Sequence, residues 1–197
     1  MSILIGVLAA GVSAVMALIL GICAATLGKK VDSAISFAID TVMGIPHILL
    51  LILISYAMGK GLKGVIAGVA LTHWTSLARL IRGEVMQLRE SEYIQIAGKL
   101  GLGKWEIAKK HIVPHVLPQF IVGLVLLFPH AILHESSITF LGFGLSTEQP
   151  AIGVIFIRKY ALSDHGQMVA GCISWMMLVL TVVLFEKGGT FIREYFM

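Results

Sequence analysis

The chain has 197 residues, of which 57% are hydrophobic and 13% are charged, and its mean hydropathy is +0.93. Soluble domains carry roughly 25% charged residues, so this composition excludes an ordinary water-soluble fold. The apolar residues occur in blocks, and a helix that crosses the hydrocarbon core of a bilayer needs about 20 mainly apolar residues. We therefore expect an integral membrane protein built from helices.

Five runs with little or no charge follow one another along the chain and predict five membrane-spanning helices. They cover residues 1–28, 33–59, 64–78, 116–134 and 166–185. The first run lacks a basic leader placed before a small-residue cleavage site, so it is interpreted as a span and not as a signal peptide. The third run is short and needs Leu80 and Ile81 to reach spanning length. The predicted fold class is an all-α, polytopic transmembrane helical bundle of about five spans.

Lys and Arg residues collect in cytoplasmic loops, so their distribution predicts the orientation of the spans. If the loop after the third span is cytoplasmic, all but four of the 15 basic residues lie inside. The four outside are Lys60, Lys63, Arg158 and Lys159. This orientation places the C-terminus inside and the N-terminus outside, which is unusual for a chain that starts directly in an apolar helix. A missing preceding span, a miscounted third span and a naturally short chain are all compatible with it.

The hydrophilic stretch between the third and fourth spans is the longest one expected in the cytoplasm, and it has helical periodicity. One apolar stripe consists of Tyr93, Ile94, Ala97 and Leu100, and a second, after Gly101 and Gly103, of Trp105, Ile107 and Ala108. The spacing predicts two short helices that meet at a glycine turn. We expect that such a unit, tethered between spans, cannot bury its apolar face within itself. Docking into a partner protein is one interpretation, and attachment of a basic loop to anionic lipid headgroups is the other.

Part of this stretch imitates a phosphate-binding loop. Gly98, Gly103 and Lys104 have the spacing of its glycines and lysine, but Trp105 occupies the place of the Ser or Thr that would bind magnesium. The sequence also predicts no buried strand before it and no second, acidic strand after it. We therefore expect that the chain does not hydrolyse ATP, is not an enzyme and needs no cofactor. ATP hydrolysis would require a separate chain.

Residues 95–114, QIAGKLGLGKWEIAKKHIVP, resemble the EAA loop of ABC-importer permeases, whose pattern is Glu-Ala-Ala, three residues, Gly, nine residues and Ile-x-Leu-Pro. Three positions match this pattern in register: Ala97, Gly101 and Pro114. Four positions depart from it: Gln95, Ile96, His111 and Val113. The flanking sequences LARLIRGEVMQLRESEYIQIAGKLG and KHIVPHVLPQ are similar to the permeases of the oligopeptide, dipeptide and nickel importers. The same is true of IPHILLLILIS in the second span and ESSITFLGFGL after the fourth.

The resemblance implies that residues 1–197 form an ABC transporter type-1 transmembrane domain, whose cytoplasmic coupling loop, residues 84–113, sits in a separate ATPase. The coupling residues that it implies are Glu92, Gln95, Ala97, Gly101, Gly103 and Pro114. Gly101 would form a turn that a side chain would obstruct, and Ala97 a surface of close approach. Family members usually have one more span before the point where this chain begins, which agrees with the expected outward N-terminus.

The implied function is that of a permease subunit in an ATP-driven importer, which moves di- or oligopeptides, or nickel, across the cytoplasmic membrane by alternating access. The implied partners are a second permease subunit, two ATPase subunits and an extracytoplasmic substrate-binding protein, with no nucleic acid. The multi-pass chain would lie in the lipid bilayer. The alternative is a membrane protein without transport activity, whose basic loop anchors lipid or a scaffold.

Polar side chains within the spans are costly and mark candidate sites. His130 and His134 are four residues apart on one helix face, with Glu135 beside them, a spacing that could present two imidazoles to a divalent metal. Lining of the pathway, or hydrogen bonds between helices, is the competing interpretation. Asp40 and His47 are seven apart in the second span and would face the same way. That spacing suggests an ion pair, a polar wall of the pathway, or a structural hydrogen bond.

Two prolines and an outer loop complete the prediction. Pro46 and Pro129 are expected to kink the second and fourth spans, because proline removes a backbone hydrogen bond. Residues 136–165 form the predicted outer loop, with a short helix near the apolar run AIGVIFI at 151–157. By analogy with the family, this loop would contact the external binding protein.

Overall fold

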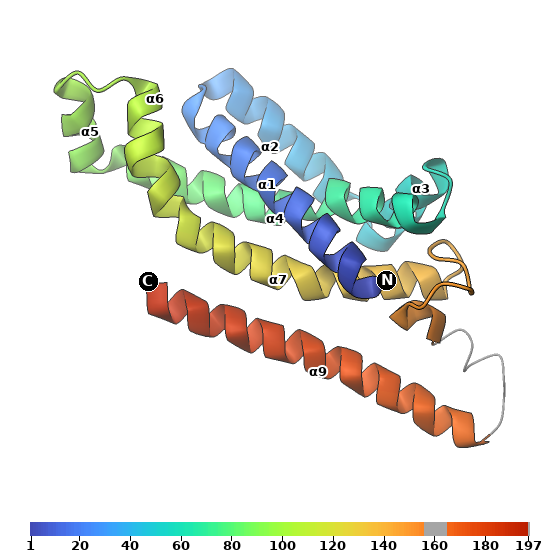
Figure 1. The fold of residues 1–197 in the computed structure, drawn as a ribbon. Coiled ribbons are helices and arrows are strands. Elements are labelled where there is room, and N and C mark those ends of the chain that lie inside the picture. The colour runs from blue at the N-terminus through green and yellow to red at the C-terminus, as the bar shows by residue number, and fades with distance from the viewer. Residues whose placement is uncertain (156–164, 197) are drawn as a thin grey trace.

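The computed structural model describes residues 1–155 and 165–196, and within these ranges every regular element is a helix. The helices are α1 (Ser2–Thr26), α2 (Lys29–Gly44), α3 (His47–Ala57), α4 (Gly61–Glu90), α5 (Glu92–Lys99), α6 (Lys104–Ile107), the π-helix η1 (Ala108–Ile112), α7 (Val113–Phe140) and α9 (His165–Phe196). α1 crosses α4 and α7, α5 and α6 project at one end, and α9 lies along α7 (Figure 1). The predicted all-α fold is confirmed.

Three of the described helical segments are long and apolar enough to cross a membrane: Ser2–Thr26, Gly61–Glu90 and Trp105–Phe140. Lys29–Gly44 and His47–Ala57 add a fourth if the two together count as one bent span. The fifth predicted span falls in α9, where the side chains at 165–175 lie outside the described part of the chain. The described residues therefore supply three or four of the roughly five spans that hydropathy predicts.

The second predicted span is two helices, not one kinked helix. α2 ends at Gly44, α3 begins at His47, and the two are bent by 98°. Ile45 is extended, with φ −93° and ψ 136°, because the ring of Pro46 clashes with a helical conformation of the residue before it. Proline therefore ends this helix instead of only kinking it.

α4 is longer than the third predicted span, since it continues through Arg79 and Arg82 to Glu90. Both arginines have acidic partners on α2. Arg82 donates two hydrogen bonds to the Asp32 carboxylate, one of them 2.7 Å long from Nη2 to Oδ2, and Arg79 pairs with Asp40. Two-point Arg–carboxylate bonding is strong and directional, so it ties α2 to the charged end of α4.

The outer loop is shorter than predicted. Residues 136–140 belong to α7, which ends at Phe140, and the loop begins at Leu141. Residues 152–155 are helical and lie in the region of the expected short helix. Arg158 and Lys159, which the orientation argument placed outside, lie beyond the described residues.

Small residues let α1 approach α4 closely. The buried face of α1 includes Ala10, Ala14, Ala17 and Gly21, and small residues at this spacing are what helix pairs in lipid use to bring their backbones together. The Ser13 hydroxyl adds a hydrogen bond across the interface, 3.0 Å to the carbonyl oxygen of Ala70. α1 is thereby packed closely along α4, and it contacts α7 as well.

Replacing Gly21 by Ala is expected to destabilise the protein by about 1–3 kcal/mol, the usual cost of overpacking. A Cβ at this position would lie 2.8 Å from the Ala78 carbonyl oxygen. Gly11→Ala is the matched control, because Gly11 is in the same helix and a Cβ there meets nothing within 4 Å. Thermal unfolding in detergent should show a lower Tm for Gly21→Ala alone. Equal Tm values for the two variants would contradict the tight α1–α4 contact.

Candidate functional site

A cavity of about 890 Å³ lies between α2, α3, α4 and α7, and the break at Ile45–Pro46 forms part of its wall. Its polar side chains are His47, Thr72, His73, Thr75, Ser76, Gln119, His130 and His134. Among the described residues, no Asp, Glu, Lys or Arg lines it. Its volume is suited to a small solute. The described residues of its wall carry no formal charge.

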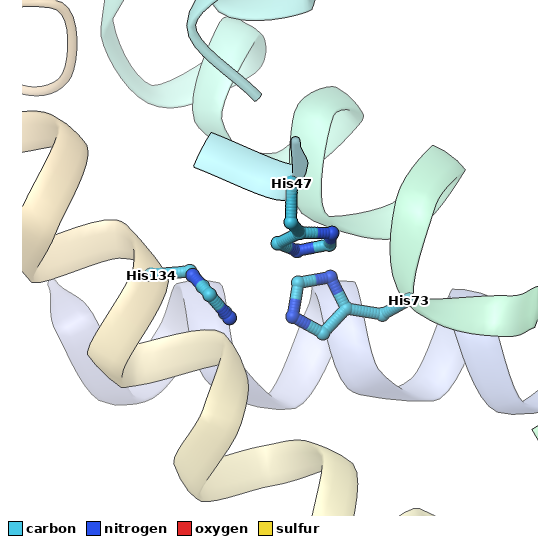
Figure 2. A group of neighbouring side chains, drawn as sticks. All are labelled: His47, His73 and His134. Atoms are coloured by element: carbon cyan, nitrogen blue, oxygen red, sulfur yellow. The ribbon is translucent and has the colours of Figure 1, made fainter. Parts of the chain in front are cut away.

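Three histidines from three different helices meet at this cavity (Figure 2). His47 is the first residue of α3, His73 lies in the middle of α4, and His134 lies near the C-terminal end of α7. Their ring centroids are 4.5 to 4.8 Å apart. One ring nitrogen of each lies within 4.8 Å of the others. We call these residues the histidine trio.

The hydrogen bonds of His73 determine which of its nitrogens carries the proton. Nδ1 lies 3.0 Å from the Val69 carbonyl oxygen, which can only accept. It also lies 3.1 Å from the Thr72 hydroxyl, whose own proton is donated to Gly68 at 2.9 Å. In the neutral ring Nδ1 is therefore the donor, and Nε2 keeps its lone pair. That Nε2, like the Nε2 of His47, is buried without a hydrogen-bond partner among the described residues.

The histidines that lie together in the structure are not the pair, His130 and His134, that the sequence suggested. His130 lines the cavity, but its Nδ1 lies 2.8 Å from the Leu126 carbonyl oxygen and it is not part of the trio. His134 instead lies beside His47 and His73. The sequence-based reasoning missed His73. His73 could have been found from the sequence, because it is a polar residue inside the uncharged third run and such residues mark candidate sites.

Asp40 and His47 do not share a face, contrary to the expectation from their spacing. The bend between α2 and α3 separates them, so the periodicity of one continuous helix does not apply. The Asp40 carboxylate accepts a hydrogen bond from Arg79, and both side chains are more than half exposed. His47 turns toward the other two members of the trio (Figure 2).

Glu135 is fully buried and is not part of the cavity wall. Its carboxylate accepts hydrogen bonds from the Thr139 hydroxyl at 3.0 Å and the Ser136 hydroxyl at 3.4 Å. The Thr139 oxygen in turn accepts the backbone N–H of Leu145 at 3.2 Å. Glu135 therefore connects the C-terminal end of α7 to the loop that follows.

The predicted pair of short helices is present as α5 and α6, but part of its apolar face is buried within the chain. Ile94 is 6% exposed and lies in one buried cluster with Leu88 of α4 and Ile112 of η1. Ala97 is buried as well. The sequence-based reasoning offered lipid or a partner protein as the cover for this face, whereas the end of α4 covers part of it.

The other apolar residues of the pair remain uncovered. Leu100 is 77% exposed and Trp105 is 82% exposed, one on each side of the turn. Gly101 has φ +92°, a left-handed conformation that favours glycine, yet a Cβ there would meet nothing within 4 Å. Backbone conformation, not obstruction by a side chain, is the reason for glycine at this turn.

The remaining predicted coupling residues flank this turn. Glu92 begins α5, and the Gln95 side chain donates a hydrogen bond of 3.0 Å to the Glu90 carbonyl oxygen. A Cβ at Gly103 would meet nothing within 4 Å, and Pro114 lies in the first turn of α7. They lie at the same end of the molecule as the exposed apolar residues, away from the cavity.

The membrane-spanning helices surround an uncharged cavity, and two of these helices, α4 and α7, lead into the projecting α5–α6 pair. This is the architecture of a membrane transport subunit. Residues 17–186 match the family described as the inner membrane component of binding-protein-dependent transport systems. The chain belongs to this family.

Curated relatives include permease proteins for different solutes. The chain is 32% identical over 154 residues to the dipeptide transport system permease protein DppC of Bacillus subtilis. The aligned region covers 78% of this chain and 48% of the relative. It is 29% identical over 184 residues to the nickel transport system permease protein NikC of Escherichia coli, covering 91% of this chain and 65% of the relative. The chain thus spans about half to two-thirds of the length of these relatives.

A solved structure has the same fold. A chain of the MetNI methionine ABC transporter, in an inward-facing conformation, superposes with a TM-score of 0.78 at 16% sequence identity. The match covers 100% of this chain and 93% of the other.

Cysteine labelling tests whether water enters the cavity. In a variant in which Cys23 and Cys172 are replaced by Ser, a cysteine in place of Ser76, which is exposed at the cavity, should react with a membrane-impermeant thiol reagent. A cysteine in place of Val69 is the matched control, because Val69 is in the same helix and is 0% exposed. Mass spectrometry reads the adduct. A cavity without water would leave both positions unreactive, and labelling of both would mean that α4 is not packed as described.

Proposed function

We propose that the chain is the membrane-spanning subunit of an ATP-driven importer and that the histidine-lined cavity is part of its translocation pathway. The observation that carries this proposal is the connection between the α5–α6 pair and the cavity. The pair is joined directly to α4 and α7, the two helices that hold His73 and His134. A partner that moves the pair would therefore move the cavity wall.

The buried contacts of α5 are suited to transmit such movement. Ile94 lies in the same buried cluster as Leu88. α6 runs through η1 into α7 without a break, since helical residues continue from 104 to 140. The π-helix in this stretch is a local widening of the kind often found at functional sites. Rocking of packed helices around a central site is the usual basis of alternating access.

The exposed apolar residues at the tip of the pair, Leu100 and Trp105, are proposed to dock into an ATPase subunit. Large apolar side chains presented by a short helix suit a groove in a partner protein. The family name implies further partners, an extracytoplasmic binding protein among them. We propose in addition a second, similar permease subunit and two ATPase subunits, all at the cytoplasmic membrane. The proposed cargo is a small peptide or nickel, the solutes in the names of the relatives DppC and NikC.

Co-purification tests the docking surface. The tagged chain, extracted from membranes of the cells that produce it, is expected to retain an ATPase subunit, identified by mass spectrometry. Trp105→Glu combined with Leu100→Glu should reduce this retention at least about 10-fold, because burying one unpaired carboxylate in an apolar groove costs several kcal/mol. Met58→Glu is the matched control: Met58 is an exposed apolar residue, 56% accessible, at the C-terminal end of α3.

Two results would contradict the proposal. The wild-type chain could retain no ATPase subunit, or the double variant could retain as much as Met58→Glu does. Binding of the loop to anionic vesicles without any ATPase would support the alternative, a loop that anchors lipid.

A further inference from the structure

The histidine trio has a property that packing alone does not explain. The Nε2 atoms of His47 and His73 are both buried without a hydrogen-bond partner among the described residues, and a buried polar atom left unsatisfied destabilises the fold. The cluster concentrates this cost at one point, where rings from three helices converge (Figure 2). Such an arrangement is unfavourable unless water or a ligand in the cavity supplies the missing partners.

We propose that His47, His73 and His134 form a binding site for one divalent transition-metal ion, which is cargo in transit through the cavity. The claim that the three imidazoles bind a metal ion is based on the geometry of the trio. The claim that the ion is cargo in transit rests on the function proposed above. The site thus selects a metal ion, and not a peptide, as the solute of this subunit.

The spacing of the nitrogens is close to what a metal requires. An ion about 2.1 Å from each of three imidazole nitrogens in tetrahedral geometry holds them about 3.4 Å apart. In the trio they lie within 4.8 Å of one another, so a shift of about 1 Å brings them to ligand distance. His47 can supply this shift because it starts α3, directly after the bend.

The surroundings of His73 resemble those of a metal ligand. Metal-binding histidines usually donate their second ring N–H to a carbonyl or carboxylate, which orients the ring and aims the free nitrogen at the metal. The Nδ1 of His73 makes this contact with Val69 at 3.0 Å, and Nε2 is left with its lone pair. His73 is therefore oriented by its own helix before any ion arrives.

The donor set restricts the kind of ion. Imidazole nitrogens suit Ni²⁺, Co²⁺, Cu²⁺ and Zn²⁺, whereas Mg²⁺ and Ca²⁺ prefer oxygen ligands. No carboxylate lines the cavity among the described residues, which removes the ligands that the harder ions need. Three neutral ligands also leave a fourth position open and the charge of the ion uncompensated. Binding is then weak enough for release, which passage through a pathway requires.

Metal titration of the purified chain tests the site directly. The protein is stripped with a chelator and titrated with Co²⁺, followed by visible absorption, and with Ni²⁺, followed by calorimetry. One ion per chain is expected. His47→Gln, His73→Gln and His134→Gln should each weaken binding at least about 10-fold, because changes that only touch the partners of a ligand already cost 10–100-fold.

His130→Gln is the matched control, since His130 lines the same cavity outside the trio and should bind metal as the wild type does. His134→Cys distinguishes loss of a ligand from loss of the fold, because a cysteine still provides a metal ligand at this position. With Cys23 and Cys172 replaced by Ser, its Co²⁺ complex should show a thiolate-to-metal absorption band, which then appears only if residue 134 touches the ion. Absence of metal binding to the wild type, or wild-type affinity in the three Gln variants, would overturn the site.

Uptake of radiolabelled nickel by cells that carry the whole transporter tests transit. The Gln variants of the trio should lose uptake and should still retain the ATPase subunit, as the wild type does. Metal binding with uptake unchanged by the Gln variants would overturn transit as the role of the site. The metal titration needs no ATPase, so failure of the proposed function through loss of ATPase retention is distinguishable from failure of the site.

Discussion

The close approach of α1 to α4 is the contact on which the rest of the structure depends. Lipid is as apolar as the helix surfaces, so helices in a bilayer associate through packing and hydrogen bonds instead of the hydrophobic effect. Gly21 has room for no more than a hydrogen beside Ala78, and Ser13 bonds to α4 across the interface. Because α1 also contacts α7, it holds two of the four helices that line the cavity. α1 thus packs on both α4 and α7 without lining the cavity itself.

Ion pairs complete the frame at the charged end of α4. Asp32 and Asp40 of α2 bind Arg82 and Arg79, so α2 follows α4 even though the chain bends sharply before α3. The bond to Asp32 is partly buried and two-pronged, which makes it the stronger of the two, whereas the exposed Asp40 pair contributes little. As a result, the bend at Pro46 stays in place and directs His47 into the cavity.

The same two helices serve both functional regions. α4 carries His73 at its middle and leads into α5, and α7 carries His134 and begins where η1 ends. A docking surface and a binding site that share rigid helices can influence one another through movement of the helices as bodies. The proposed docking surface and the proposed metal site are thus connected by the same two helices, α4 and α7, and each can be tested without the other.

The sequence by itself determined the membrane setting, the helical class and the glycine turn between α5 and α6, because hydropathy, periodicity and turn chemistry depend on residues close together in the chain. It also identified His47 and His134 as candidates, since a polar residue inside an apolar run stands out locally. Only the tertiary structure decided that His73 completes the trio and that Asp40 pairs with an arginine instead of His47. Those contacts join residues on different helices, and their positions follow from the bend at Pro46 and the packing of α1, which no local pattern contains. For the same reason, burial of Ile94 against the end of α4 became visible only in the folded chain.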